Sequence, residues 1–224
     1  MRKAKRIYSR RERALRAALI ALALLLYCNG VLHLGFLLPA QETAFAAQYN
    51  GVYGPVKTVA VQWKRGMMHF ADRLSLVEGE NSLSLHGTYL APYGWEPSFL
   101  WPVDTADGAD VHAGVVCMCR EAHEDVLVFF GRIRGTDVTY LYPNVTVQRY
   151  DDAEKQFVHV HGYANEVVEA EKYVKDGYTY FICAFADPVP AEYMDLERTF
   201  QLVVNRESGS EDHEVEYVAG VVWG

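Results

Sequence analysis

Cysteine is scarce in this chain. The four cysteines stand at positions 28, 117, 119 and 183, and the first of them lies inside a long apolar segment. A small secreted domain stapled by disulfides carries more cysteines, in even number. The fold must therefore depend on a hydrophobic core, which 224 residues are enough to bury. Free, buried thiols are expected, and a disulfide between Cys119 and Cys183 is kept as the alternative.

The sequence also lacks the motifs of the common enzyme classes. There is no G-x-S-x-G elbow, no H-E-x-x-H helix, no P-loop and no dinucleotide-binding fingerprint. Carboxylate pairs that hydrolyse sugars are defined by their separation in space, so a sequence does not reveal them. We therefore favour a non-catalytic protein. A metal-dependent or glycan-directed hydrolase of the cell envelope remains the alternative.

Basic residues become rare after position 16. Residues 1–16 carry eight Lys and Arg and one acid, whereas residues 17–224 carry 13 basic and 28 acidic residues, a formal charge of −15. No Lys or Arg stands between Arg16 and Lys57. A surface this acidic repels phosphate backbones, so nucleic acid is not expected as a partner.

Residues 17–38 form an apolar segment of 22 residues without a formal charge. About 20 apolar residues cross a bilayer as a helix, and the basic cluster ahead of the segment favours a cytoplasmic N-terminus. The sequence thus predicts a cytoplasmic tail over 1–16, a transmembrane signal-anchor helix over 17–38 and a single-pass protein of the cell membrane. The alternative is a cleaved signal peptide, since Ala44-Phe45-Ala46 resembles a cleavage site.

The remainder predicts an extracytoplasmic β domain. Residues 39–55 are expected to be a linker, and alternating apolar and polar residues begin at position 56. The strands are expected at 56–63, 67–76, 83–90, 113–120, 126–134, 138–142, 145–150, 157–164, 178–186, 198–205 and 215–223, with 167–174 left open between strand and helix. This spacing predicts an all-β fold, an antiparallel β-sandwich of immunoglobulin-like architecture over 56–224. It divides into sub-parts 56–112 and 113–224.

Residues 91–112 interrupt the strand pattern with three prolines and a group of aromatic residues. Because proline is disfavoured in central strands, we expect a long loop here. Exposed aromatic rings on a loop are typical of a binding platform, which makes Tyr93, Trp95 and Trp101 candidate ligand-binding residues. Trp95 is expected to be the more exposed tryptophan. The alternative is that the loop closes the core.

Two histidines and three aspartates are candidate metal ligands. His159 and His161 are two residues apart on a predicted strand, so both belong to one face and suit zinc.

Asp104, Asp107 and Asp110 surround a glycine, as oxygen ligands of calcium do in extracellular modules. The spacing is not that of an EF-hand. A solvated acidic loop is the more ordinary interpretation, and we expect no cofactor, with calcium or zinc as the alternatives.

These observations favour a membrane-anchored, extracytoplasmic binding module. Residues 17–38 are expected to contact the membrane, and the domain is expected to bind an unidentified protein or glycan at the cell surface.

Overall fold

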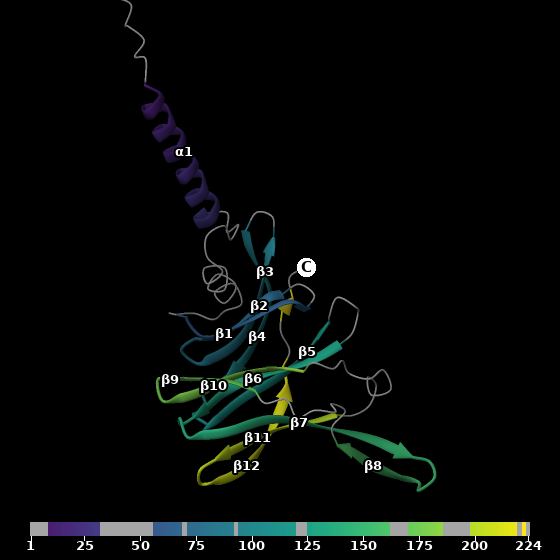
Figure 1. Ribbon diagram of the computed structural model, residues 1–224. Coiled ribbons are helices and arrows are strands. Elements are labelled where there is room, and N and C mark those ends of the chain that lie inside the picture. The colour runs from purple at the N-terminus through teal and green to yellow at the C-terminus, as the bar shows by residue number, and fades with distance from the viewer. Residues whose placement is uncertain are drawn as a thin grey trace, which may run out of the picture.

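The structure is a computed structural model that describes residues 9–31, 56–68, 71–91, 94–119, 125–161, 170–185, 198–218 and 221–222. Over these residues the chain forms one N-terminal helix followed by strands. Figure 1 shows the helix standing apart from two β-sheets. The predicted all-β class, built from antiparallel sheets, is therefore confirmed for the described part of the chain.

Helix α1 spans Arg10–Val31, and a capping box sets its start. The Glu12 N–H donates to Ser9 Oγ at 3.2 Å, and the Ser9 N–H donates to Glu12 Oε2 at 2.8 Å. This reciprocal pair satisfies two backbone N–H groups that would otherwise lack partners. The helix thus begins inside the basic tail, earlier than the predicted residue 17.

The apolar side chains of α1 are exposed. They lie all round the helix, because successive residues are about 100° apart. The exposed side chains are Leu15, Leu19, Ile20, Leu22, Leu24, Leu25, Leu26 and Tyr27.

The predicted span over 17–38 continues past the described helix, since residues 32–38 lie outside the described part. Among the described residues, no helix combines the length and the apolar character that crossing a membrane requires.

The first sheet has five strands in the order β1-β2-β3-β4-β13. Their bounds are β1 Lys57–Met68, β2 Ala71–Glu78, β3 Ser82–Ala91, β4 Gly94–Asp104 and β13 Val221–Val222. All neighbours in this sheet are antiparallel. The predicted hairpin between β2 and β3, turning at residues 79–81, is confirmed.

The second sheet has eight strands in the order β8-β7-β11-β12-β5-β6-β10-β9. Their bounds are β5 Val111–Cys119, β6 Asp125–Arg134, β7 Val138–Asp151, β8 Gln156–His161, β9 Glu171–Lys175, β10 Tyr178–Ala184, β11 Arg198–Arg206 and β12 Gly209–Tyr217. The pairing is antiparallel except where β12 meets β5 in parallel at Glu216 and Tyr217. Among the described residues, the sheets of five and eight strands together hold more strands than the seven to nine of an immunoglobulin sandwich.

The eight-stranded sheet curls, and the molecule has three layers (Figure 1). The middle layer, made by β5, β6 and β10, packs on both faces. On β6, Val126, Val128 and Phe130 enter a core shared with the five-stranded sheet. Leu127 and Phe129 enter a second core shared with β7, β11 and β12. A strand buried on both faces has an uninterrupted apolar sequence, as Val-Leu-Val-Phe-Phe at 126–130 does.

Strand β4 corrects the predicted loop over residues 91–112. Its prolines lie where β4 has only β3 as a neighbour, because β13 pairs with Phe99 and Leu100 alone. Proline is tolerated at such an edge, where no partner strand needs its N–H. Pro143 is accommodated in the same way inside β7, which pairs there with β11 but not yet with β8. One strand thus replaces the two predicted over 138–150.

Strand β1 departs from its predicted alternation. A register shift between Thr58 and Ala60 inserts an extra residue, and both Val59 and Ala60 are buried. The bulge changes which residues face the core. Gln62 is therefore buried, and its Nε2 donates to the Ile182 carbonyl at 3.0 Å. This bond fastens the first sheet to the middle layer.

Candidate functional site

The acidic loop between β4 and β5 uses its carboxylates to hold its own shape. Asp104 Oδ1 accepts from the Ala106 N–H at 2.9 Å. Asp107 Oδ1 accepts from the Ala109 N–H at 3.0 Å and lies 2.7 Å from His112 Nε2. The two contacts, backbone first, lower the pKa of Asp107.

Asp110 belongs to the same loop but is paired elsewhere. Its Oδ1 lies 3.1 Å from Arg134 Nη1, an ion pair that ties the loop to β6. The three predicted calcium ligands therefore contact three different partners. Within the described residues, no group of three or more His, Cys, Asp or Glu side chains is arranged to hold a metal.

His112 continues the loop into a buried polar network. Its Nδ1 lies 3.5 Å from Arg132 Nε, and Arg132 Nη1 lies 2.5 Å from Glu78 Oε1. The Tyr180 hydroxyl donates to Glu78 Oε2 at 3.0 Å. Burial, together with the Glu78 charge, raises the pKa of Tyr180. The guanidinium of Arg132 also lies 4.8 Å from the centroid of the Tyr178 ring.

This network joins strands from two layers, β2 on one side and β5, β6 and β10 on the other. Both nitrogens of His112 are occupied, and its side chain is only 4% exposed. A base that accepts a substrate proton needs an accessible nitrogen. The network therefore acts as a structural clamp between sheets.

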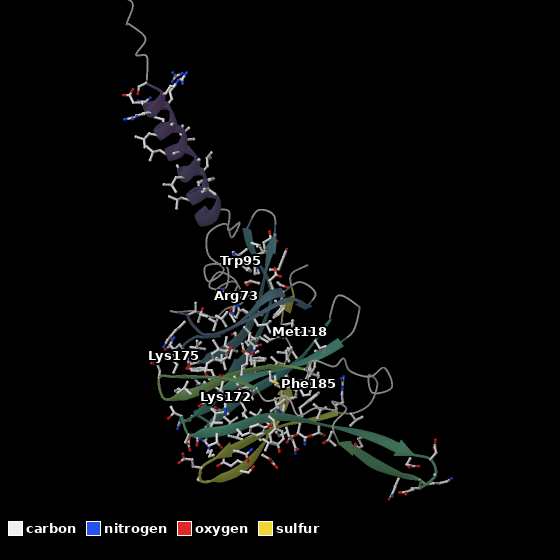
Figure 2. All side chains as sticks on the ribbon, viewed as in Figure 1. Arg73, Trp95, Met118, Lys172, Lys175 and Phe185 are labelled. Atoms are coloured by element: carbon white, nitrogen blue, oxygen red, sulfur yellow. The ribbon has the colours of Figure 1, made fainter. Side chains whose placement is uncertain are left out.

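The predicted aromatic platform is divided by the fold. Trp101 lies on β4 in the first core, 8% exposed, with its ring centroid 4.2 Å from that of Phe99. Trp95 is half-buried near the start of β4 (Figure 2), so the predicted order of exposure is correct. Tyr93 lies outside the described residues. Trp101 was assigned to an exposed loop, and that premise is wrong because the segment is a strand, on which Phe99, Trp101 and Val103 face the first core.

The predicted zinc histidines lie on β8 by their backbone. His159 pairs with Gln148 of β7, and His161 pairs with Thr146. Their side chains lie outside the described part of the structure.

The proposed bridge between Cys119 and Cys183 is not supported by the strand order. Cys183 lies in the second core and is 2% exposed. Cys119 pairs with Asp125 on one side of β6, and Cys183 pairs with Phe129 on the other side. Two strand spacings, about 9.5 Å, separate them across the sheet, and their partners on β6 are four residues apart, about 13.6 Å along the strand. Their Cα atoms are therefore farther apart than the about 7 Å that a disulfide tolerates.

Several polar side chains are buried on the side of the five-stranded sheet that is opposite the first core. Ser75 of β2 stands directly across from His86 of β3, and both are 1% exposed. Burial lowers the pKa of His86 to about 3, so the ring is neutral. Among the described residues, neither ring nitrogen of His86 has a hydrogen-bond partner, and the hydroxyls of Ser84, Thr88 and Ser98 have none either. These groups cost stability in the folded state.

A surface on the outer side of the third layer, which we call the tyrosine–acid face, was not predicted from the sequence. It consists of outward residues of β7, β11 and β12: the exposed Asp212, Glu214 and Glu216, the half-buried Tyr140, Tyr142, Asn144 and Gln201, and the buried Val203 between them. The alternating residues Leu141, Val145, Leu202, Val204 and Val215 point the other way, into the second core. Burial of this alternate set fixes the outward direction of the face.

Cross-strand pairing arranges the tyrosine–acid face in rows. Asn144 lies opposite Gln201, and Gln201 lies opposite Glu214. The Asn144 Nδ2 donates to Gln201 Oε1 at 3.4 Å. In the next row, Val203 lies between Tyr142 and Asp212.

The two tyrosine rings extend the surface along β7. The ring centroids of Tyr140 and Tyr142 are 5.4 Å apart, and both side chains are half-buried. The face therefore offers aromatic rings, amides and carboxylates side by side on a rigid sheet. Aromatic rings and amides of this kind suit stacking and hydrogen bonding with a ligand.

The signal for this face was present in the sequence of β7. Tyr140, Tyr142, Asn144, Thr146 and Gln148 occupy alternate positions. The apolar residues between them mark a strand whose polar side carries aromatic and amide groups. The acidic residues that join them come from β12, and the sequence does not reveal that pairing.

The chain matches no family model, no curated protein and no solved structure.

Proposed function

We propose that the chain is a membrane-anchored, non-catalytic binding module that engages its partner through the tyrosine–acid face. The main support for this binding role is the rows of outward side chains on β7, β11 and β12. These rows combine two tyrosine rings with paired amides and with carboxylates. Tyrosine supplies a large contact area at a small cost in conformational entropy, and it is enriched at binding surfaces.

The position of the face supports this role. Its residues stand on strands whose opposite sides are packed in the second core, so the side chains are held in a fixed pattern. A preorganised surface loses less entropy on binding than a mobile loop does.

Helix α1 is the proposed membrane anchor. Arg10, Arg11, Arg13 and Arg16 open α1, and exposed leucines follow them around its circumference. Apolar side chains exposed on every side favour an apolar surrounding. The cations at the N-terminal end support a cytoplasmic tail, with the β domain on the other side of the membrane.

Co-purification tests the binding surface. The full chain, extracted from membranes of the source cells in mild detergent, is compared with a Tyr142→Ala/Gln201→Ala variant. The matched control is Glu80→Ala/Asp152→Ala, two exposed turn residues outside the face. We expect the wild type and the control to retain the same partner and the face variant to lose it, with unchanged melting temperatures. Equal recovery by all three proteins would contradict the proposal.

Alkaline carbonate extraction tests the anchor. The full chain should stay in the membrane pellet, and a Leu24→Lys/Leu25→Lys variant should shift to the supernatant because charges in the bilayer are unfavourable. A mature protein that begins near residue 47 would show instead that a signal peptide is removed.

A further inference from the structure

Strand β12 contributes three carboxylates to the tyrosine–acid face: Asp212, Glu214 and Glu216. Several acids elsewhere pair with a basic side chain: Glu78 with Arg132, Asp107 with His112, Asp110 with Arg134, Asp137 with Arg206 and Asp176 with Lys57. Among the described residues, no ion pair or hydrogen bond engages the side chains of Asp212, Glu214 or Glu216. All three are exposed.

The outward positions of the three strands contain no Lys or Arg. On β12 they are Ser210, Asp212, Glu214 and Glu216, so three successive outward positions carry an acid. Outward positions on β7 and β11 carry tyrosines, amides, threonines and one valine. The face therefore presents negative charge beside aromatic rings, with no cation on it to offset that charge.

The protein itself shows how such a combination holds an arginine. The guanidinium of Arg132 lies 2.5 Å from a Glu78 carboxylate oxygen and 4.8 Å from the Tyr178 ring centroid. An ion pair and a cation–π contact act together on one side chain there. The tyrosine–acid face displays the same two groups outward, on the surface.

The spacing between rows of side chains on the tyrosine–acid face matches a partner in extended conformation. Val203 separates Tyr142 from Asp212, and it forms an apolar floor over which the methylene stem of an Arg or Lys can lie. Successive rows are two residues apart, about 6.8 Å along a strand. Alternate side chains of an extended peptide have the same repeat.

We propose that the partner is a protein segment, bound in extended conformation, with Arg or Lys at alternate positions. This inference rests on the proposed function and specifies the partner class. A neutral glycan would use the tyrosines and amides but would leave three carboxylates without a counter-charge, whereas a cationic segment engages every group on the face.

A peptide titration tests the partner class on the full chain in detergent micelles. The probe is a fluorescent peptide of alternating arginine and serine, and its control has the same composition with the arginines grouped at one end. A neutral oligosaccharide of N-acetylglucosamine forms the third arm. The variants are Asp212→Asn/Glu214→Gln and the charge-matched control Glu80→Gln/Asp152→Asn.

We expect the alternating peptide to bind more tightly than the grouped one. Each carboxylate lost from the face should weaken binding roughly two- to fivefold, and the control variant should bind like the wild type. Tyr142→Ala should weaken it by a similar factor through the lost cation–π contact.

Three results would overturn the inference. Equal binding of both peptides, with equal loss in both charge variants, would indicate attraction to net charge alone. Binding of the oligosaccharide but not of the peptide, removed by Tyr142→Ala, would leave the proposed function standing with the wrong partner class. Failure of all three probes, with self-association of the Asp212→Asn/Glu214→Gln variant, would show that the acids merely guard strand β12 against aggregation. Failure of the co-purification as well would remove the proposed function.

Discussion

Replacing Gly87 with alanine should destabilise the protein, because β4 lies directly against β3. Gly87 pairs with Phe99, and a Cβ added to Gly87 would lie 2.2 Å from two carbons of the Phe99 ring. Phe99 is 3% exposed, and the Trp101 ring stands 4.2 Å from it. The phenylalanine therefore has little room to move away. Gly87 does not have a positive φ, so the effect is steric.

The magnitude follows from two opposing effects. Overpacking a core costs about 1–3 kcal/mol. A glycine-to-alanine change with no clash would instead stabilise by about 0.4–1 kcal/mol through the unfolded chain. We expect a net loss of about 1–2 kcal/mol, which lowers the melting temperature by roughly 2–8 °C for a domain of this size.

Urea denaturation of the wild type, Gly87→Ala, Phe99→Leu and the double variant gives a double-mutant cycle. The smaller leucine should accommodate the new methyl group, so the double variant should be more stable than the sum of the single effects by about 1 kcal/mol. A Gly87→Ala protein as stable as the wild type would contradict this reasoning and would favour the loop that the sequence alone predicted for residues 91–112.

Three further predictions concern buried polar groups. Glu78→Gln should cost about 2–4 kcal/mol in urea denaturation, because it leaves the Arg132 guanidinium, whose side chain is 12% exposed, without its carboxylate; a loss below about 0.5 kcal/mol would count against the clamp. The pKa of His86 is lower in the folded state, at about 3, than its ordinary value of 6.5, so the stability that the neutral ring contributes is complete above about pH 6.5 and is lost as pH falls toward 3. His86→Phe should flatten the melting temperature across that window, and an unchanged pH profile would show that another group is responsible. Ser84→Ala should leave stability equal or higher, because it removes a buried hydroxyl that has no hydrogen-bond partner in the described part of the chain; a loss above about 1 kcal/mol would mean that the hydroxyl has one.

Sequence patterns located most strands because exposed strands alternate and turns contain polar residues and glycine. They failed where a neighbouring strand decides the outcome. Pro97 and Pro102 suggested a loop, although β4 accepts them on the side that no strand pairs with. In β1, one inserted residue at Val59 changed which side chains face the core, and Gln62 became buried.

The sequence of β6 indicated that this strand is covered on both faces, although a two-sheet sandwich was predicted. The apolar run through Phe129 and Phe130 on β6 has no polar alternate, because both faces of that strand are covered. Segment 167–174, left open between helix and strand, contributes to β9, where Tyr173 donates from its hydroxyl to the Val61 carbonyl at 3.1 Å. Local propensity did not decide between helix and strand for this segment, and the strand that forms is in contact with β1.

The tyrosine–acid face could also be predicted only in part, because strand pairing brings its residues together. Tyr140, Tyr142 and Asn144 alternate visibly in the sequence, whereas Asp212 and Glu214 join them only through pairing across β11. Asp104, Asp107 and Asp110 were grouped by sequence distance, yet their side chains take separate partners within the fold. The direction of the side chains, which depends on strand pairing, brings the residues of the tyrosine–acid face together and keeps the three aspartates apart.

Site-specific photo-crosslinking at position 201 tests the central claim most directly. A photoreactive amino acid replaces Gln201 in the full chain, at the middle of the tyrosine–acid face, and in a parallel protein it replaces Glu80 in the exposed turn between β2 and β3. Irradiation in the source membranes should give a discrete protein adduct from position 201 and none from position 80, and Tyr142→Ala should abolish it. No adduct from position 201, or the same adducts from both positions, would contradict a binding role for this face.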